Sequence, residues 1–172
     1  VPQSTPLRDG SRDAHTIDPA MVERIEVIHG ANALQGLGAS GGIINIITKR
    51  APRTDGERFH EVMLGASGAL PTESDGLGTR ASYLYGQRSG GFDVVAGASH
   101  ATEGLHYDGD GRALAVNGVQ GDLMDSESTN LFAKLGFDLG SDRRLQLTAS
   151  HYALDGNGDY VSVPGSIATG TT

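Results

Sequence analysis

Two overlapping spacings in the 172-residue sequence match motifs of enzyme sites. Residues 36–41 fit the G-x-G-x-x-G fingerprint of dinucleotide-binding proteins, and residues 38–42 fit the G-x-S-x-G elbow that presents a serine nucleophile, here Ser40. Both motifs need a helix directly afterwards, whereas residues 43–47 are rich in β-branched side chains and predict a strand. We therefore predict no catalytic residue and no enzyme, and keep a serine hydrolase using Ser40 as the enzyme alternative.

Metal-binding patterns are equally incomplete. Asp155-x-Asn157-x-Asp159 begins like a calcium loop, but Tyr160 replaces the required glycine and Ser166 replaces the bidentate glutamate. The six histidines, at positions 15, 29, 60, 100, 106 and 151, show no H-x-x-x-H spacing. The sequence thus predicts no metal site and no cofactor.

Composition narrows the class of protein further. The formal net charge is −8, which argues against a nucleic-acid partner, and the absence of cysteine excludes disulfide scaffolds and thiolate sites. No run of 18 apolar residues occurs, so no transmembrane helix is predicted, and the mean hydropathy of −0.25 suits either a soluble protein or a membrane barrel. The start at Val1 without a signal-peptide pattern suggests an internal piece of a longer protein.

The first 52 residues predict two short strands. A turn at Asp18 and Pro19 leads into residues 22–28, which are rich in β-branched side chains and stop at Gly30. After several glycines, residues 43–48 form a second β-branched run, which predicts a strand buried on both faces.

From residue 59 onward apolar and polar residues alternate with a period of two. Five such segments begin near residues 59, 79, 92, 129 and 145, and Leu84 and Val95 are exceptions to the alternation. Long connections after the first and third segments alternate with tight ones after the second and fourth. Segments of about ten residues with this pattern are typical of a transmembrane barrel, although the strands of a soluble all-β binding module alternate equally well.

Residues 22–30, reading V-E-R-I-E-V-I-H-G, and the following Leu34, Gly36 and G-G-I-I-N-I-I-T-K over residues 41–49 resemble the end of the plug domain of TonB-dependent outer-membrane receptors. In that family the barrel follows this motif directly. The plug-motif positions carried over, with a structural or gating role, are Glu23, Arg24, Glu26, His29, Gly30, Gly36, Gly41, Gly42 and Asn45. Two positions depart from the family pattern, because His29 replaces the usual Arg and Gln35 replaces the usual Tyr.

The resemblance implies a mainly β fold: residues 1–52 are the C-terminal part of an α+β plug, and residues 53–172 supply about five antiparallel strands of a 22-stranded barrel that this chain leaves incomplete. It also implies transport of a scarce ligand across the bacterial outer membrane, with a ferric siderophore as the first candidate and haem, cobalamin and carbohydrate as others. The implied partners are outer-membrane lipid and the TonB complex, which would act through a segment outside this chain. Arg8, Arg12 and His15 are the expected ligand-binding residues, because cationic side chains suit an anionic chelate.

Overall fold

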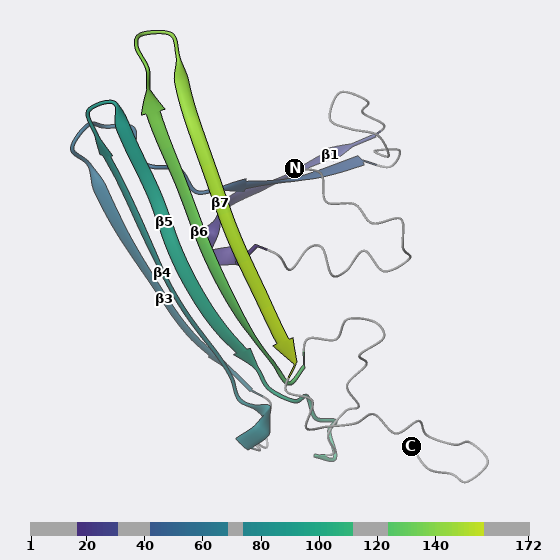
Figure 1. Cartoon of the computed structure of the whole chain (residues 1–172). Helices are drawn as coiled ribbons and strands as arrows, with labels where there is room; N and C mark the ends of the chain where they lie inside the picture. The colour runs from purple at the N-terminus through teal and green to yellow at the C-terminus, as the bar shows by residue number, and fades with distance from the viewer. Residues whose placement is uncertain (1–16, 31–41, 69–73, 112–123, 157–172) are drawn as a thin grey trace. The chain divides into compact units, whose positions relative to one another are not determined.

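The computed structural model describes residues 17–30, 42–68, 74–111 and 124–156 (Figure 1). Its elements in chain order are the 3-10 turn η2 (Pro19–Met21), the strands β1 (Val22–His29), β2 (Gly42–Thr48) and β3 (Arg58–Ser67), the 3-10 turn η4 (Ser74–Gly76), and the strands β4 (Gly78–Ser89), β5 (Phe92–Glu103), β6 (Ser126–Asp138) and β7 (Arg144–Gly156). All seven predicted strands are confirmed. Among the described residues no helix is long and apolar enough to cross a membrane.

Strands β1 and β2 form an antiparallel hairpin of their own. Ile25 pairs with Ile46 and Val27 with Ile44, so these four side chains share one face of the hairpin. The prediction that the second strand is buried on both faces is wrong for this chain, because Ile44 is 70% exposed. A two-stranded sheet pairs strand edges without covering either face.

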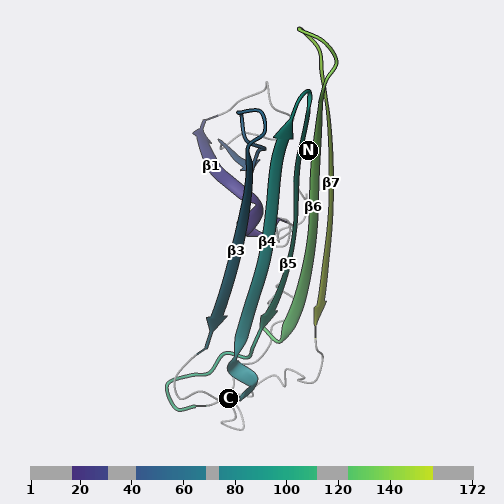
Figure 2. The same ribbon diagram turned by 90° about the vertical axis from the view of Figure 1, so that its left-hand side faces the viewer.

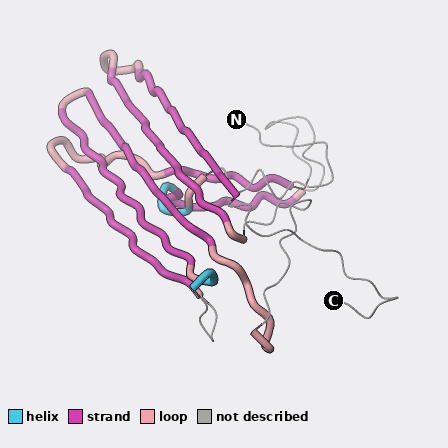
Figure 3. Tube along the Cα trace, turned by 60° about the horizontal axis from the view of Figure 1, so that its bottom comes forward, coloured by secondary structure: helices cyan, strands magenta, loops and turns pink. Residues whose placement is uncertain are grey.

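The other five strands form one sheet in the order β3-β4-β5-β6-β7, and successive strands run in opposite directions (Figures 1 and 2). Because neighbours in the sheet are also neighbours in the chain, every connection is a simple hairpin. The tight turns between β4 and β5 and between β6 and β7 contain Gly90 and Gly140, both at positive φ. Figure 3 shows these turns at one end of the sheet. The predicted alternation of long and tight connections is confirmed.

By contacts the chain divides into two compact units. The first comprises residues 1–63, 82–99 and 130–152, and it contains the hairpin together with parts of β3 to β7. The second comprises residues 64–81, 100–129 and 153–172. In the second unit the hydroxyl groups of Thr79 and Thr102 lie 2.8 Å apart, and Gly76 is close to the ring of Tyr107.

Within the first unit the sheet has two different faces. On one, which we call the outer face, large apolar side chains remain exposed, namely Val62, Tyr83, Phe92, Leu131, Leu139, Leu145 and Leu147. The opposite, inner face is mainly polar but carries the hydrophobic core, in which Met21 packs with Leu84, Val95 and Phe132. Leu84 and Val95 break the sequence alternation because they belong to this core.

Candidate functional site

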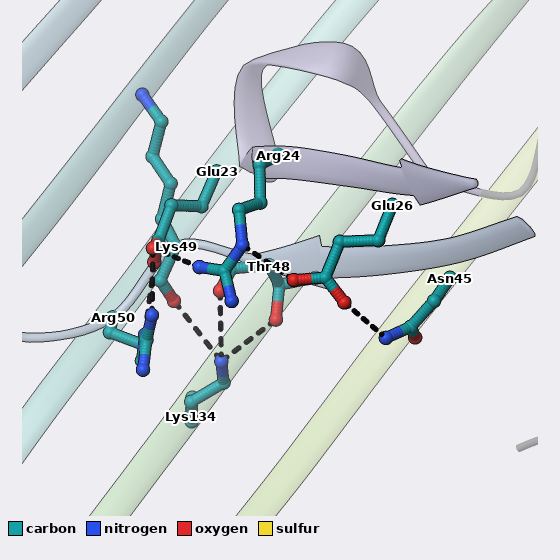
Figure 4. A network of polar contacts seen from close by, with 8 residues as sticks. All are labelled: Glu23, Arg24, Glu26, Asn45, Thr48, Lys49, Arg50 and Lys134. Carbon is teal, nitrogen blue, oxygen red and sulfur yellow. Dashed lines mark hydrogen bonds and ion pairs between the residues drawn. The ribbon is translucent and has the colours of Figure 1, made fainter. Parts of the chain in front are cut away.

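The polar residues of the hairpin form a continuous network of ion pairs (Figure 4). The Arg50 guanidinium binds both carboxylate oxygens of Glu23, at 2.8 and 3.0 Å. Arg24 bridges the two glutamates of its own strand, donating to Glu23 and to Glu26 at 2.8 Å each. The second oxygen of Glu26 accepts from the Asn45 amide at 3.1 Å, which ties β1 to β2 across the pair Glu26–Asn45.

This network keeps its carboxylates ionised. The hydrogen bonds from Arg50, together with the charges of Arg50 and Arg24, lower the pKa of Glu23 to about 2. Hydrogen bonds from Arg24 and Asn45 also lower the pKa of Glu26, and the bonds of Arg50 to Glu23 raise the pKa of Arg50. Groups that keep their charge at every physiological pH are suited to fixing a position and not to transferring protons.

A lysine of the sheet reaches the end of the hairpin. The ammonium of Lys134, on β6, donates to the Thr48 hydroxyl at 2.7 Å and to the backbone carbonyls of Lys49 at 3.1 Å and Thr48 at 3.4 Å. All three acceptors are neutral oxygen atoms. Beside them the Lys49 ammonium pairs with the Glu61 carboxylate on β3.

The segment that leads from β2 to β3 is fastened to the turn between β4 and β5. Gly56 N–H donates to the Arg88 carbonyl at 2.9 Å, and Arg88 N–H donates to the Glu57 carbonyl at 3.0 Å. Gly90 N–H donates to the Asp55 carboxylate. The base of the hairpin, meaning residues 18–22 and 48–50, and the segment after it therefore both contact the sheet.

A second charged cluster joins the two tight turns. Arg88 and Arg144 each bind both Asp93 and Asp138, so that four side chains from four strands close a ring of alternating charges. Gly136 lies against this ring, where a Cβ would collide with the Arg144 guanidinium and come within 2.6 Å of the Asp93 carboxylate. The ring links the ends of β4, β5, β6 and β7, and a side chain at position 136 would require its members to shift.

The predicted plug-motif residues separate into three groups. Glu23, Arg24, Glu26 and Asn45 come together in the network. His29, Gly30 and Gly42 lie at the opposite end of the hairpin, where His29 pairs with Gly42, is exposed, and makes no ion pair within the described residues. Gly36 and Gly41, the ligand-binding candidates Arg8, Arg12 and His15, and the alternative nucleophile Ser40 all lie outside the described residues.

Sequence reasoning missed the cations that complete the site, namely Lys49, Arg50 and Lys134. In the sequence, Lys49 and Arg50 are recognisable only as two cations that follow the second predicted strand. Lys134 is a cation on the polar face of a predicted strand, and nothing in a period-two pattern shows which partner such a side chain meets. Among the residues that the structure describes, no group of histidine and carboxylate side chains could hold a metal ion.

The chain is similar to three bacterial proteins over nearly its whole length. It is 30% identical to the rhizobactin receptor of Rhizobium meliloti (strain 1021) and 31% identical to the ferric aerobactin receptor of Klebsiella pneumoniae, each over 89% of this chain and 20% of the relative. It is 32% identical to the vitamin B12 transporter BtuB of Photobacterium profundum, over 88% of this chain and 22% of the relative. The chain thus spans about a fifth of the length of these relatives. No family model and no solved structure matches it.

Proposed function

Because the chain belongs to the TonB-dependent outer-membrane receptors, we propose that the whole protein carries a ligand across the outer membrane, with a ferric siderophore as the first candidate. The observation that carries this proposal is the similarity to the rhizobactin receptor and the ferric aerobactin receptor over 89% of the chain. The relatives are receptors and transporters, which supports a function without covalent chemistry.

In this proposal residues 1–52 are the end of the plug, and residues 53–172 are the first strands of the barrel. The sheet has the two faces that such a barrel wall needs. Its outer face exposes large apolar side chains that would contact lipid, and its inner face carries the charged and polar groups that contact the hairpin. A soluble all-β module would instead bury apolar side chains such as Leu131 and Leu147 against a second sheet.

The ligand would be bound by plug residues before the hairpin, with Arg8, Arg12 and His15 as contacts to an anionic chelate. Transport energy would come from the TonB complex, acting on a segment of the whole protein outside this chain. The motif residues Glu23, Arg24, Glu26 and Asn45 would keep the plug strands together during transport, through the network described above.

Uptake by cells tests this function. The full-length gene is expressed in an iron-starved strain that lacks its own siderophore receptors, in matched backgrounds with and without a working TonB complex. The ligands supplied are ferric rhizobactin, ferric aerobactin and vitamin B12. We expect TonB-dependent uptake of a ferric siderophore. Uptake of vitamin B12 alone would overturn the siderophore assignment. If the receptor reaches the cell surface in normal amounts and none of the three ligands is taken up, these ligands are rejected as its substrates.

The ligand-binding residues are tested separately in the same cells. Arg8→Ala and Arg12→Ala should weaken binding of an anionic ferric siderophore about tenfold or more, because each removes a charge-assisted hydrogen bond. Arg53→Ala, which removes an exposed cation from the segment after the hairpin, is the matched control and should bind normally. Equal affinity in all three variants would reject these arginines as ligand contacts.

A further inference from the structure

The inner face of the sheet is mainly polar, and its buried apolar side chains gather on three neighbouring strands, with the half-buried Phe59 of β3 packed beside them. Leu84 on β4, Val95 on β5 and Phe132 on β6 are apolar and buried there, and together they form what we call the Met21 socket. The side chain of Met21, from the turn that precedes β1, is fully buried against them. These apolar residues interrupt the polar face at the place where the hairpin contacts it.

The socket depends on a missing side chain. Gly97 follows Val95 by two residues on β5 and therefore shares its face. A Cβ at position 97 would come within 2.6 Å of a Leu84 methyl carbon and within 2.7 and 2.8 Å of the Met21 sulfur and methyl carbon. Real Cβ atoms essentially never show such short contacts, so a side chain at position 97 would require the ends of Met21 and Leu84 to shift from their present places.

A buried polar contact fixes the turn that presents Met21. The Asp18 carboxylate accepts from the backbone N–H of Ala20 at 2.7 Å, and Met21 N–H donates to the Asp18 carbonyl at 2.9 Å. The hydroxyl of Ser99, on β5, donates to the other Asp18 oxygen at 2.8 Å. Asp18 and Ser99 are both buried, so the turn is tied to the same strand that carries Gly97.

We propose that Met21 and its socket hold the base of the hairpin to the barrel wall and thereby keep the pore closed, with Gly97 as the positioning residue that makes the socket deep enough. This inference rests on the proposed function, since it takes the hairpin as the end of a plug inside a barrel. The socket shares no residue with the charged network, and it adjoins the network where Lys49 N–H donates to the Met21 carbonyl at 2.9 Å and where the Lys134 ammonium lies 5.6 Å from the centre of the Phe132 ring. Apolar contact is also not screened by salt, so the socket holds under conditions that weaken the ion pairs.

Outer-membrane permeability tests the socket in the full-length protein. Gly97→Ala and Met21→Ala should each cause a several-fold rise in entry of a large antibiotic that intact outer membranes exclude. Met21→Leu, which conserves the volume of the side chain, should keep the membrane closed. Gly65→Ala is the matched control on β3, because its new Cβ would meet only the Arg80 Cβ, at 3.9 Å.

Thiol labelling separates unseating from a failure of the barrel to assemble. In a full-length protein whose only cysteine is Ala20→Cys, a buried position in the same turn that leaves Met21 in place, we expect slow reaction with a membrane-impermeant maleimide, and several-fold faster reaction when Gly97→Ala is added. Unchanged permeability in both Gly97→Ala and Met21→Ala at normal surface levels, or equal labelling rates, would overturn the socket. If the unmodified protein takes up none of the ligands but the variants still change the permeability, only the proposed transport function is overturned.

Discussion

The ammonium group of Lys134 lies 2.7 Å from the hydroxyl group of Thr48, although 86 residues separate them in the chain. Thr48 is the last residue of β2, and Lys134 is on β6 of the five-stranded sheet. The Lys134 ammonium also donates to the backbone carbonyls of Thr48 and Lys49. It therefore joins the end of the hairpin to the sheet through main-chain atoms as well as through a side chain. The two carbonyl acceptors are present whatever side chains occupy positions 48 and 49.

Replacing Lys134 with methionine tests this link. The variant keeps the apolar stem but removes the ammonium, so the three acceptors lose a charged donor at a cost of about 1.5–3 kcal/mol. We expect faster amide hydrogen exchange over residues 48–50 of the full-length protein. Lys49→Met is the comparison, since it leaves its own carbonyl in place and removes only a pair whose Glu61 side chain is 50% exposed. Equal exchange in the two variants would contradict a special role for Lys134.

The pH dependence of the hairpin follows from Glu23. Its pKa is lowered from 4.5 to about 2, so its ion pairs contribute stability that is complete above about pH 4.5 and is lost as the pH falls toward 2. We expect hydrogen exchange of the hairpin, corrected for the intrinsic rate, to be constant from about pH 5 to 8 and faster at about pH 3.

Glu23→Gln provides the control for this titration. The variant lacks the titrating carboxylate, so the additional exchange in acid should be reduced. Its effect at neutral pH should be modest, about 1 kcal/mol or less, because Arg24 and Arg50 are half exposed. An acid response that is the same with and without Glu23 would assign the titration to another group.

A side chain at position 136 is expected to disturb the ring of Arg88, Asp93, Asp138 and Arg144. The Cβ of Gly136→Ala would displace Arg144 or Asp93 from the four-membered ring, and overpacking of this kind costs about 1–3 kcal/mol. We predict less folded protein in the outer membrane and a lower thermal midpoint in detergent. Gly65→Ala makes the same change on β3 without a close contact and should behave like the unmodified protein.

An added charge should lower the unfolding free energy on the outer face of the sheet but not on the inner face. Leu147→Arg places a guanidinium on the face that carries the exposed apolar residues, where a lipid-facing arginine costs up to about 2–4 kcal/mol at mid-membrane and less toward the interfaces. Gln146→Arg adds the same charge one residue earlier and, by the alternation of a strand, on the opposite face. We expect lower unfolding free energy in lipid vesicles for the first variant alone. Equal loss in both would reject the assignment of the two faces.

Much of the fold could be predicted from the sequence, because a period of two is a local property. Strands, tight turns and the separation of apolar from polar faces follow from neighbours such as Leu145 and Gln146. The breaks in the pattern were informative too, since Leu84 and Val95 lie where the hairpin packs. The prediction that residues 43–48 are buried was wrong because burial depends on what covers a strand. The strand that carries Ile44 belongs to a sheet of two strands.

The candidate site could be predicted only in part. Glu23, Arg24 and Glu26 lie close in sequence on one strand, and Asn45 is brought to Glu26 by hairpin register, which a motif can encode. Arg50 meets Glu23 from 27 residues away, and Lys134 meets Thr48 from 86. Such contacts depend on how elements pack together, which no local pattern contains.

Within the described residues, the position of the contacts between the hairpin and the sheet has a mechanical consequence. These contacts gather at residues 18–22 and 48–50 and along residues 55–57, whereas His29 and Gly42 lie a strand length away, about 20 Å for a strand such as β2. A force applied at His29 or Gly42 would act a strand length away from the Met21 socket and Lys134, which hold the base of the hairpin. Such a force loads these few contacts before it stretches the strand itself. A small force on the far end can therefore decide whether the base of the hairpin stays in place.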